Sequence, residues 1–93
     1  MKIRNFRHKG LEDFFRTGAV TGVKPTHATR LRGSLSILSN ANSVDEFSRV
    51  AHQMSKGSKY EGYWAMKISA QWRIIFKVSV GETIYDIDYV NYH

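Results

Sequence analysis

The sequence predicts an α+β fold, with two N-terminal helices packed on one face of a mainly antiparallel sheet, in the order β-α-α-β-β-β-β. Apolar residues in the first half of the chain recur at helical spacing. The second half is made of short runs rich in aromatic and β-branched residues, which favour strands. Helices followed by a run of strands indicate the α+β class. The chain of 93 residues has no internal repeat or linker, so we expect one domain, residues 1–93.

The first predicted elements are a short strand in the opening segment KIRNF and a helix in GLEDFFRTG. Leu11, Phe14 and Phe15 fall on one face of that helix. We expect Gly18 to end it, because glycine readily takes the left-handed conformation found at helix C-termini.

The second helix is predicted in VKPTHATRLRGSLSILSNAN. Pro25 suits a first helical position because its fixed φ is compatible with a helix. An apolar stripe follows at steps of three and four, made of Ala28, Leu31, Leu35 and Leu38. The segment SNANS should end the helix, and the two helices should form an αα-hairpin.

Four strands are predicted in the second half, in the segments SRVAHQM, YWAMKIS, WRIIFKVS and TIYDIDYVNYH. A polar loop with two lysines, SKGSKYEG, separates the first two, and SAQ and VGE mark the later turns. A two-residue turn at SAQ would pair residues whose numbers have an odd sum.

Strand alternation with this pairing assigns each side chain to one of two sheet faces. The helix-covered face is expected to hold Tyr63, Ala65, Lys67, Trp72, Ile74, Phe76 and Val78. The open face is expected to hold Trp64, Met66, Ile68, Arg73, Ile75 and Lys77. On the last strand, one face is expected to hold Tyr85, Ile87, Tyr89, Asn91 and His93, and the other Ile84, Asp86, Asp88, Val90 and Tyr92.

Charge and composition restrict the kind of partner. Lysine and arginine total 14 against 8 acidic residues, a net charge of +6. This excess of positive charge favours a polyanionic partner such as nucleic acid. The alternative is that the charge only keeps the protein soluble, for which a smaller net charge is sufficient. The absence of cysteine excludes a disulfide framework and fits a reducing cytosol. Because the sequence has neither a signal-peptide pattern nor an apolar run that spans a bilayer, we expect a soluble cytoplasmic protein without a membrane partner.

The candidate site combines His52, Lys56, Arg73 and His93, basic groups that adjacent strands could bring into one cleft. Mid-strand, Arg73 is either ion-paired with an aspartate of the last strand or a fixed cation facing a phosphate. His8 and His27 are expected to be structural or merely exposed rather than catalytic.

The chemistry open to this set is limited by what the sequence lacks. It has no suitably spaced carboxylate pair, zinc pattern or Gly-rich phosphate loop, so we expect no metal or cofactor. Acid–base histidines, phosphate-holding cations and aromatic rings suit metal-free cleavage of RNA by its own 2′-hydroxyl.

The segments NFRHKGLEDFFRTG, HATRLRGSLSIL, WAMKISAQWRI and DYVNYH resemble the HigB group of toxins in the RelE/ParE toxin–antitoxin superfamily. The resemblance covers nearly the whole chain. It implies a compact α+β toxin that cleaves messenger RNA on the translating ribosome without metal. It also implies neutralisation by a HigA-like antitoxin with a helix-turn-helix domain.

The resemblance also implies roles for individual residues. The expected catalytic residues are His52, Lys56, Arg73, Tyr92 and His93, and the expected substrate contacts are Asn91, Lys59 and Lys77. In this sequence Asn91 replaces the family's aspartate, and the His-to-Lys spacing is one residue longer than in the family. Ser69 and Ala70 replace the family's Asn-Gly turn, which should change the turn type.

Two other functions are compatible with such a chain. One is a ParE-like toxin that inhibits DNA gyrase by binding it, on the same fold and without nuclease activity. The other is an RNA-binding module without catalysis. The histidine and lysine set favours the nuclease, because a gyrase inhibitor needs no acid–base groups.

Overall fold

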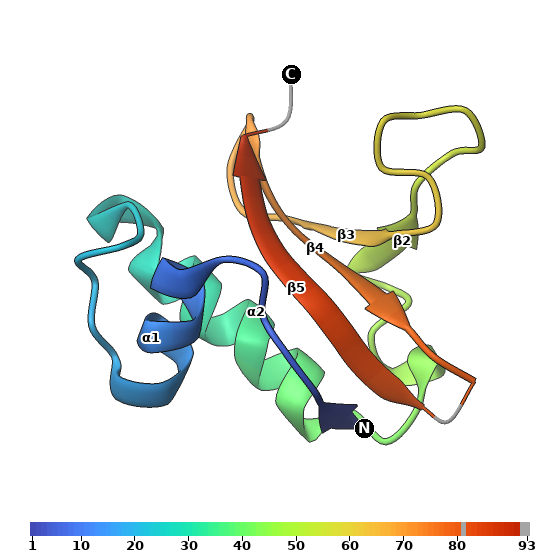
Figure 1. Ribbon diagram of the computed structural model, residues 1–93, viewed down its shortest axis with the longest axis horizontal. Coiled ribbons are helices and arrows are strands. Elements are labelled where there is room, and N and C mark those ends of the chain that lie inside the picture. The colour runs from blue at the N-terminus through green and yellow to red at the C-terminus, as the bar shows by residue number, and fades with distance from the viewer. Residues whose placement is uncertain (81, 92–93) are drawn as a thin grey trace.

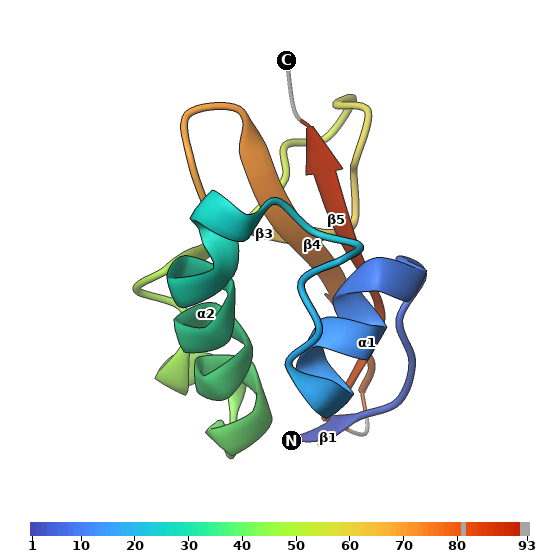
Figure 2. The ribbon, with the colours of Figure 1, turned by 90° about the vertical axis from the view of Figure 1, so that its left-hand side faces the viewer.

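Two helices cover one face of a five-stranded sheet in the computed structural model, which describes residues 1–80 and 82–91 (Figure 1). The helices are α1 (Lys9–Thr17) and α2 (Ala28–Asn40), with the short 3-10 helices η1 (Pro25–His27) and η2 (Val44–Glu46) before and after α2. The strands are β1 (Lys2–Ile3), β2 (Ala51–Gln53), β3 (Trp64–Lys67), β4 (Trp72–Val78) and β5 (Thr83–Asn91). The predicted order β-α-α-β-β-β-β is therefore confirmed. Figure 2 shows both helices in front of the sheet.

The sheet has the strand order β1-β5-β4-β3-β2. All neighbours among β2 to β5 are antiparallel, whereas β1 runs parallel to β5. The prediction of a mainly antiparallel sheet is confirmed, and β5 lies inside the sheet between β1 and β4. Neither helix of the described part of the chain is long and apolar enough to cross a membrane.

Local interactions explain where α1 begins and ends. The Nδ1 atom of His8 accepts a hydrogen bond from the backbone N–H of Leu11 at 3.0 Å, so this histidine caps the helix N-terminus. Gly18 ends the helix with φ of 81°, and its N–H donates to the carbonyl of Phe14. Both the predicted helix end at Gly18 and the structural role of His8 are confirmed.

The packing of α2 follows its predicted apolar stripe. Leu31, Leu35 and Leu38 are buried against the sheet, and Pro25 begins the 3-10 turn that leads into the helix. Ser34 is also buried on this helix, which the apolar pattern alone does not predict.

Two glycines allow α1 to contact the segment that leads to α2. A Cβ atom added to Gly10 would lie 2.4 Å from the carbonyl oxygen of Gly22, and one added to Gly22 would lie 2.4 Å from the Cα of Gly10. Such distances are shorter than any ordinary van der Waals contact, so each position requires the absence of a side chain.

The hairpin between β3 and β4 has a different register from the predicted one. The observed partners are Trp64↔Phe76, Ala65↔Ile75, Met66↔Ile74 and Lys67↔Arg73, all with an even sum. The loop consists of residues 69–71 rather than two residues, and the backbone N–H groups of Ile68 and Ser69 both donate to the carbonyl of Trp72. The predicted pairing of residues with an odd sum was therefore wrong, because the loop is one residue longer than expected.

With this register, every β3 residue shares a sheet face with different β4 residues from those predicted. Trp64, Met66 and Ile68 join Trp72, Ile74 and Phe76 on the helix-covered side, where all six belong to the core or pack against it. Tyr63, Ala65 and Lys67 belong instead with Arg73, Ile75 and Lys77. The predicted faces of β4 itself, with Ile74 and Phe76 buried and Arg73 on the open side, are confirmed.

A β-bulge interrupts β5 at Asp86. The register shifts between Ile75↔Asp88 and Lys77↔Tyr85, and Asp86 has a positive φ of 51°. Asn5 supports this conformation, because its Nδ2 donates to Oδ1 of Asp86 at 3.0 Å and its Oδ1 accepts from the Asp86 N–H at 3.1 Å.

The bulge corrects the predicted faces of the last strand. Ile84 and Ile87 are both fully buried, although strict alternation would separate them. Tyr85 pairs with Lys77 and therefore lies on the open face, not with Ile87 and Tyr89 as predicted.

His27 is buried beneath the end of the sheet and pairs with Tyr89. Its Nδ1 lies 2.5 Å from the Tyr89 hydroxyl, and its ring contacts Trp72 and Tyr89 edge-on. The predicted structural role of His27 is confirmed. Burial lowers the pKa of His27, as does the charge of Lys24, and burial raises the pKa of Tyr89.

The contact between Gly10 and Gly22 gives a testable expectation for stability. Gly10→Ala should lower the free energy of unfolding by about 1–3 kcal/mol, because the added methyl group meets backbone atoms that cannot move away cheaply. The control is Gly33→Ala, at a position in α2 with open space around it, where the same change should leave stability equal or raise it by about 1 kcal/mol. Urea denaturation followed by circular dichroism measures both, and equal effects of the two substitutions would contradict the role of the glycine contact.

The lowered pKa of His27 predicts a pH dependence of stability. Between its folded pKa and its unfolded value near 6.5, the unfolded chain binds a proton that the folded chain does not. Stability should therefore fall as the pH drops below about 6.5, and the fall should be smaller in His27→Gln. Melting temperatures of both proteins at several pH values test this. Parallel curves would show that His27 titrates normally.

Candidate active site on the open face of the sheet

The sheet face opposite the helices carries the candidate site. Ala65 and Ile75 are each 1% exposed, yet they lie outside the main core cluster because they point to this other face. Figure 1 shows the loop between β2 and β3 standing away from the helices, beside β3. This loop and the strands beneath it form a hollow on the open face.

Strand pairing brings His52 and Arg73 to this hollow. His52 pairs with Ala65, which pairs with Ile75, so these three side chains form a row across β2, β3 and β4. Arg73 lies on the same face, two residues before Ile75. A pocket of about 190 Å³ results, lined by His52, Gln53, Met54, Ser55, Ala65, Arg73 and Ile75.

Backbone carbonyls of the β3–β4 hairpin hold the guanidinium of Arg73. Its Nη1 donates to the carbonyl oxygens of Ser69 at 2.7 Å and Trp72 at 3.1 Å, with a longer contact to Ala70. Arg73 is half-buried, so its charge is fixed at the pocket by the hairpin loop and by strand β4. A positioned guanidinium suits a phosphate oxygen better than a mobile one does.

The predicted lysines lie outside this pocket. Lys56 and Lys59 are exposed in the loop between β2 and β3, and the Nζ of Lys59 lies 5.4 Å from the ring centroid of Tyr60. Lys77 is on the open face, farther along β4, with its Nζ 4.8 Å from the ring centroid of Tyr63.

The end of β5 lies beside the pocket. Asn91 pairs with Trp72, the residue directly before Arg73, and its side chain is exposed on the helix side of the sheet. Asn91 therefore does not line the pocket. The predicted Tyr92 and His93 lie outside the described residues.

Ala65, Ile75 and three further lining residues were not predicted as site residues; the three are Gln53, Met54 and Ser55. They follow His52 directly, and the polar character of Gln53 and Ser55 at the end of a strand was the available signal. Their place in the pocket depends on how the following loop turns, which the sequence pattern does not show.

An imidazole and a guanidinium in one small pocket can transfer a proton and stabilise an anion. Residues 1–80 and 82–91 contain no group of three or more histidines, aspartates or glutamates that could hold a metal ion. The pocket offers an acid–base group in His52 and a cationic group in Arg73.

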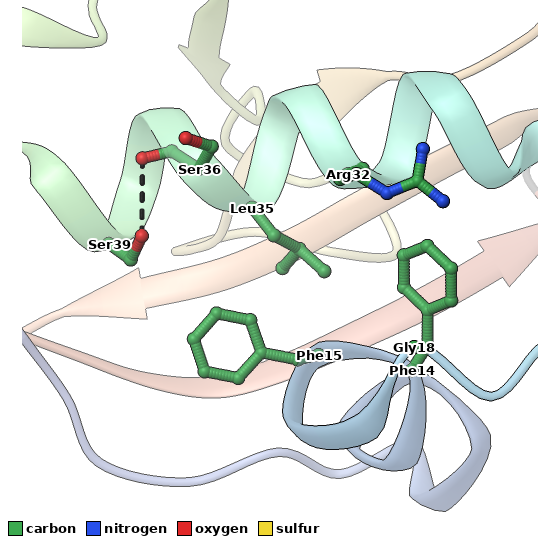
Figure 3. A pocket seen from close by; sticks show the side chains of 7 residues that line it. All are labelled: Phe14, Phe15, Gly18, Arg32, Leu35, Ser36 and Ser39. Carbon is green, nitrogen blue, oxygen red and sulfur yellow. Dashed lines mark hydrogen bonds between the residues drawn. The ribbon is translucent and has the colours of Figure 1, made fainter.

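Two larger hollows on the protein lack this chemistry. One, of about 320 Å³, lies between the helices, and Figure 3 shows Phe14 and Phe15 of α1 on one side of it and Leu35 and Arg32 of α2 on the other. The second, of about 600 Å³, runs along α2 and includes Thr29, Arg30 and Lys67. Neither is lined by a histidine or a carboxylate, so neither has a group suited to acid–base catalysis at neutral pH.

Comparisons with known proteins agree on one family. The model of HigB-like toxins, described as the RelE-like toxin of the type II toxin–antitoxin system HigB, matches residues 4–93. Endoribonuclease HigB from Proteus vulgaris is 33% identical over 93 residues, which cover 98% of this chain and 99% of that protein. A solved structure of the RelBE2 toxin–antitoxin complex from Mycobacterium tuberculosis has a similar fold, with a TM-score of 0.50 and 12% identity over 97% of this chain and 95% of that chain.

Proposed function

Because this chain belongs to the HigB-like toxins, the RelE-like toxins of type II toxin–antitoxin systems, we propose that it is an endoribonuclease that cleaves messenger RNA on the translating ribosome. The similarity to Endoribonuclease HigB supports cleavage of RNA. The observation that carries the proposal is the pocket in which His52 and Arg73 meet on the open face. An inhibitor that acts only by binding DNA gyrase would not need an imidazole beside a fixed guanidinium.

The proposed reaction uses the 2′-hydroxyl of the RNA as the nucleophile. A base takes the proton of that hydroxyl while its oxygen bonds to the adjacent phosphorus. The bond from phosphorus to the 5′-oxygen of the next nucleotide then breaks, and an acid gives this oxygen a proton. The products are a 2′,3′-cyclic phosphate and a free 5′-hydroxyl.

We assign Arg73 to the charge that develops on the phosphorane oxygens, because its guanidinium is already held in place. His93 serves as acid or base, and His52 provides a further proton-transfer group. Lys56 contacts a phosphate from the adjacent loop.

The remaining assignments concern substrate position. Tyr92 and Asn91 position the substrate at the end of β5, and Lys59 and Lys77 contact its phosphates. Asn91 pairs with Trp72 at the same end of the sheet as Arg73, but its side chain lies on the helix-covered side, so it would contact the substrate beyond the pocket rather than at the reacting phosphate. An amide can hydrogen-bond but carries no charge, so this role is contact rather than proton transfer.

The proposed setting follows from the family. As a toxin of a type II system, the protein is expected to bind an antitoxin. We propose a HigA-like antitoxin with a helix-turn-helix domain, and a cytoplasmic location with access to ribosomes.

Substitutions at the site test the catalytic assignment. Arg73→Ala and His93→Ala should each lower the cleavage rate by about 10²–10⁴-fold, because each removes a positioned charge or proton-transfer group. The readout is the appearance of new RNA 5′ ends in translated messages, together with growth arrest.

Arg16→Ala serves as the control for these substitutions. Arg16 is an exposed cation on α1 whose ion pair with Glu12 contributes little to stability, so cleavage should remain near wild type. Circular dichroism must show that the Arg73 variant keeps its fold, since the arginine also bonds the hairpin loop. A folded Arg73→Ala protein with wild-type cleavage would exclude the assignment.

The product termini test the mechanism independently of mutation. Cleavage should proceed with magnesium-saturated EDTA, which removes zinc and manganese but leaves enough free magnesium to keep the ribosomes intact, and it should leave a 2′,3′-cyclic or 3′-phosphate. Gel mobility after phosphatase or kinase treatment distinguishes these ends. A 5′-phosphate product, or activity restored only by zinc or manganese, would contradict attack by the 2′-hydroxyl.

A further inference from the structure

We propose that a row of alternating tyrosines and basic residues on the open face binds single-stranded RNA beside the candidate active site. The row consists of Tyr63, Lys77, Tyr85 and Arg4, and we refer to it as the tyrosine–cation row. This inference rests on the proposed function and adds to it the surface that holds the substrate on either side of the reacting phosphate.

The row is a product of strand pairing. Lys77 pairs with Tyr85, and the pairing of Trp64 with Phe76 places Tyr63 at the position next to Lys77. Arg4 follows β1 and its N–H donates to the carbonyl of Ile84, which brings it beside Tyr85. The four side chains thus come from neighbouring segments across the sheet and share the face that carries Arg73.

Each tyrosine ring of the row is in contact with a cation. The Nζ of Lys77 lies 4.8 Å from the ring centroid of Tyr63, and the Cζ of Arg4 lies 4.6 Å from that of Tyr85. Arg7 adds a hydrogen bond from its Nη1 to the Tyr63 hydroxyl at 3.3 Å. These contacts keep the rings in place while their cations remain on the surface.

The rings of the row are not needed for the core. Tyr63 and Tyr85 are half-buried and belong neither to the core cluster nor to the hydrophobic residues packed against it. Half-exposed aromatic rings fixed on a sheet surface are suited to stacking with unpaired bases, and adjacent cations are suited to the phosphates.

The row extends into the loop beside the pocket. The rings of Tyr60 and Tyr63 are 6.2 Å apart and nearly perpendicular, and Lys59 lies over Tyr60. Along β4, Lys77 is about 13 Å from Arg73, so one strand of RNA can reach the row and the pocket together.

Two carboxylates on β5 lie close to this surface, and both accept hydrogen bonds. Asp86 accepts from Asn5 at 3.0 Å, and Oδ1 of Asp88 accepts from the backbone N–H of Tyr89 at 2.9 Å. With Glu61, from the loop that carries Lys59, three carboxylates accompany the four cations Arg4, Arg7, Lys59 and Lys77, so the surface stays net positive and remains suited to a polyanion.

The experiment measures binding of a fluorescently labelled, 2′-O-methyl RNA oligonucleotide to the full chain by fluorescence anisotropy. The 2′-O-methyl group blocks the nucleophile, so binding is measured without cleavage. Tyr85→Leu should weaken binding about 5- to 150-fold, because it removes a stacking ring, whereas Tyr85→Phe should bind like wild type. Arg4→Gln should weaken binding and reduce the slope of log K against log salt by about 0.7.

The matched control is Arg32→Gln. Arg32 also lies over an aromatic ring, 5.7 Å from the centroid of Phe14, but it lies on the helix side of the protein. This substitution changes the net charge by the same amount as Arg4→Gln and should leave RNA affinity within about twofold. Since Arg4 is exposed, its variant remains informative even if Tyr85→Leu fails to fold.

The outcomes for the row and for the nuclease are separable. If Tyr85→Leu and Arg4→Gln bind RNA as the wild type does, or if Arg32→Gln loses as much affinity as they do, the proposed row is wrong. Cleavage of RNA by the wild type would still support the nuclease in that case. Loss of binding in the row variants, in a protein that cleaves no RNA, would support the row and overturn the nuclease. Wild-type protein that does not bind the oligonucleotide would overturn the row outright.

Discussion

The alternation of side chains along β4 is the constraint on which the core and the site both depend. Ile74 and Phe76 are fully buried under the helices, while Arg73 and Lys77 point to the other face. A shift of the β4 pairing register by one residue would bury Arg73 and expose Phe76. The apolar packing of the core therefore determines which face carries the arginine. The hairpin loop reinforces this register, because its carbonyls accept hydrogen bonds from the guanidinium of Arg73.

Lys77 and Arg4 on the open face lie over tyrosine rings, whereas two cations of α1 pair with carboxylates. In the described residues, the two ion pairs are Lys9–Asp13 and Arg16–Glu12, both within α1. A carboxylate partner would neutralise a cation's field, but a tyrosine ring leaves its full charge on the surface. Lys77 and Arg4 therefore keep their charge on the face that carries the candidate site.

The sequence predicts most of the fold because its patterns are local. Helical stripes, Gly18 and strand composition specify the elements, and His52 and Arg73 were identified as basic groups that adjacent strands could bring into one cleft. The errors arise where distant residues decide the conformation. The loop of residues 69–71 contains no Asn-Gly signal to define its length, and the bulge at Asp86 depends on Asn5, 81 positions away. The tyrosine–cation row depends on both features, which is why the sequence alone did not reveal it.

The hydrogen bonds between Asn5 and the bulge at Asp86 affect the order in which parts of the protein fold during synthesis. Strand β1 pairs only with β5 among the described strands, so the N-terminal segment emerges without its partner. At about 5–20 residues per second, a ribosome needs roughly 4–16 seconds to make the intervening chain. Until then the parallel pair of β1 and β5 cannot form, and neither can the bulge. The contact between Arg4 and Tyr85 on the open face is also absent. The proposed tyrosine–cation row therefore forms only after β5 has been synthesised.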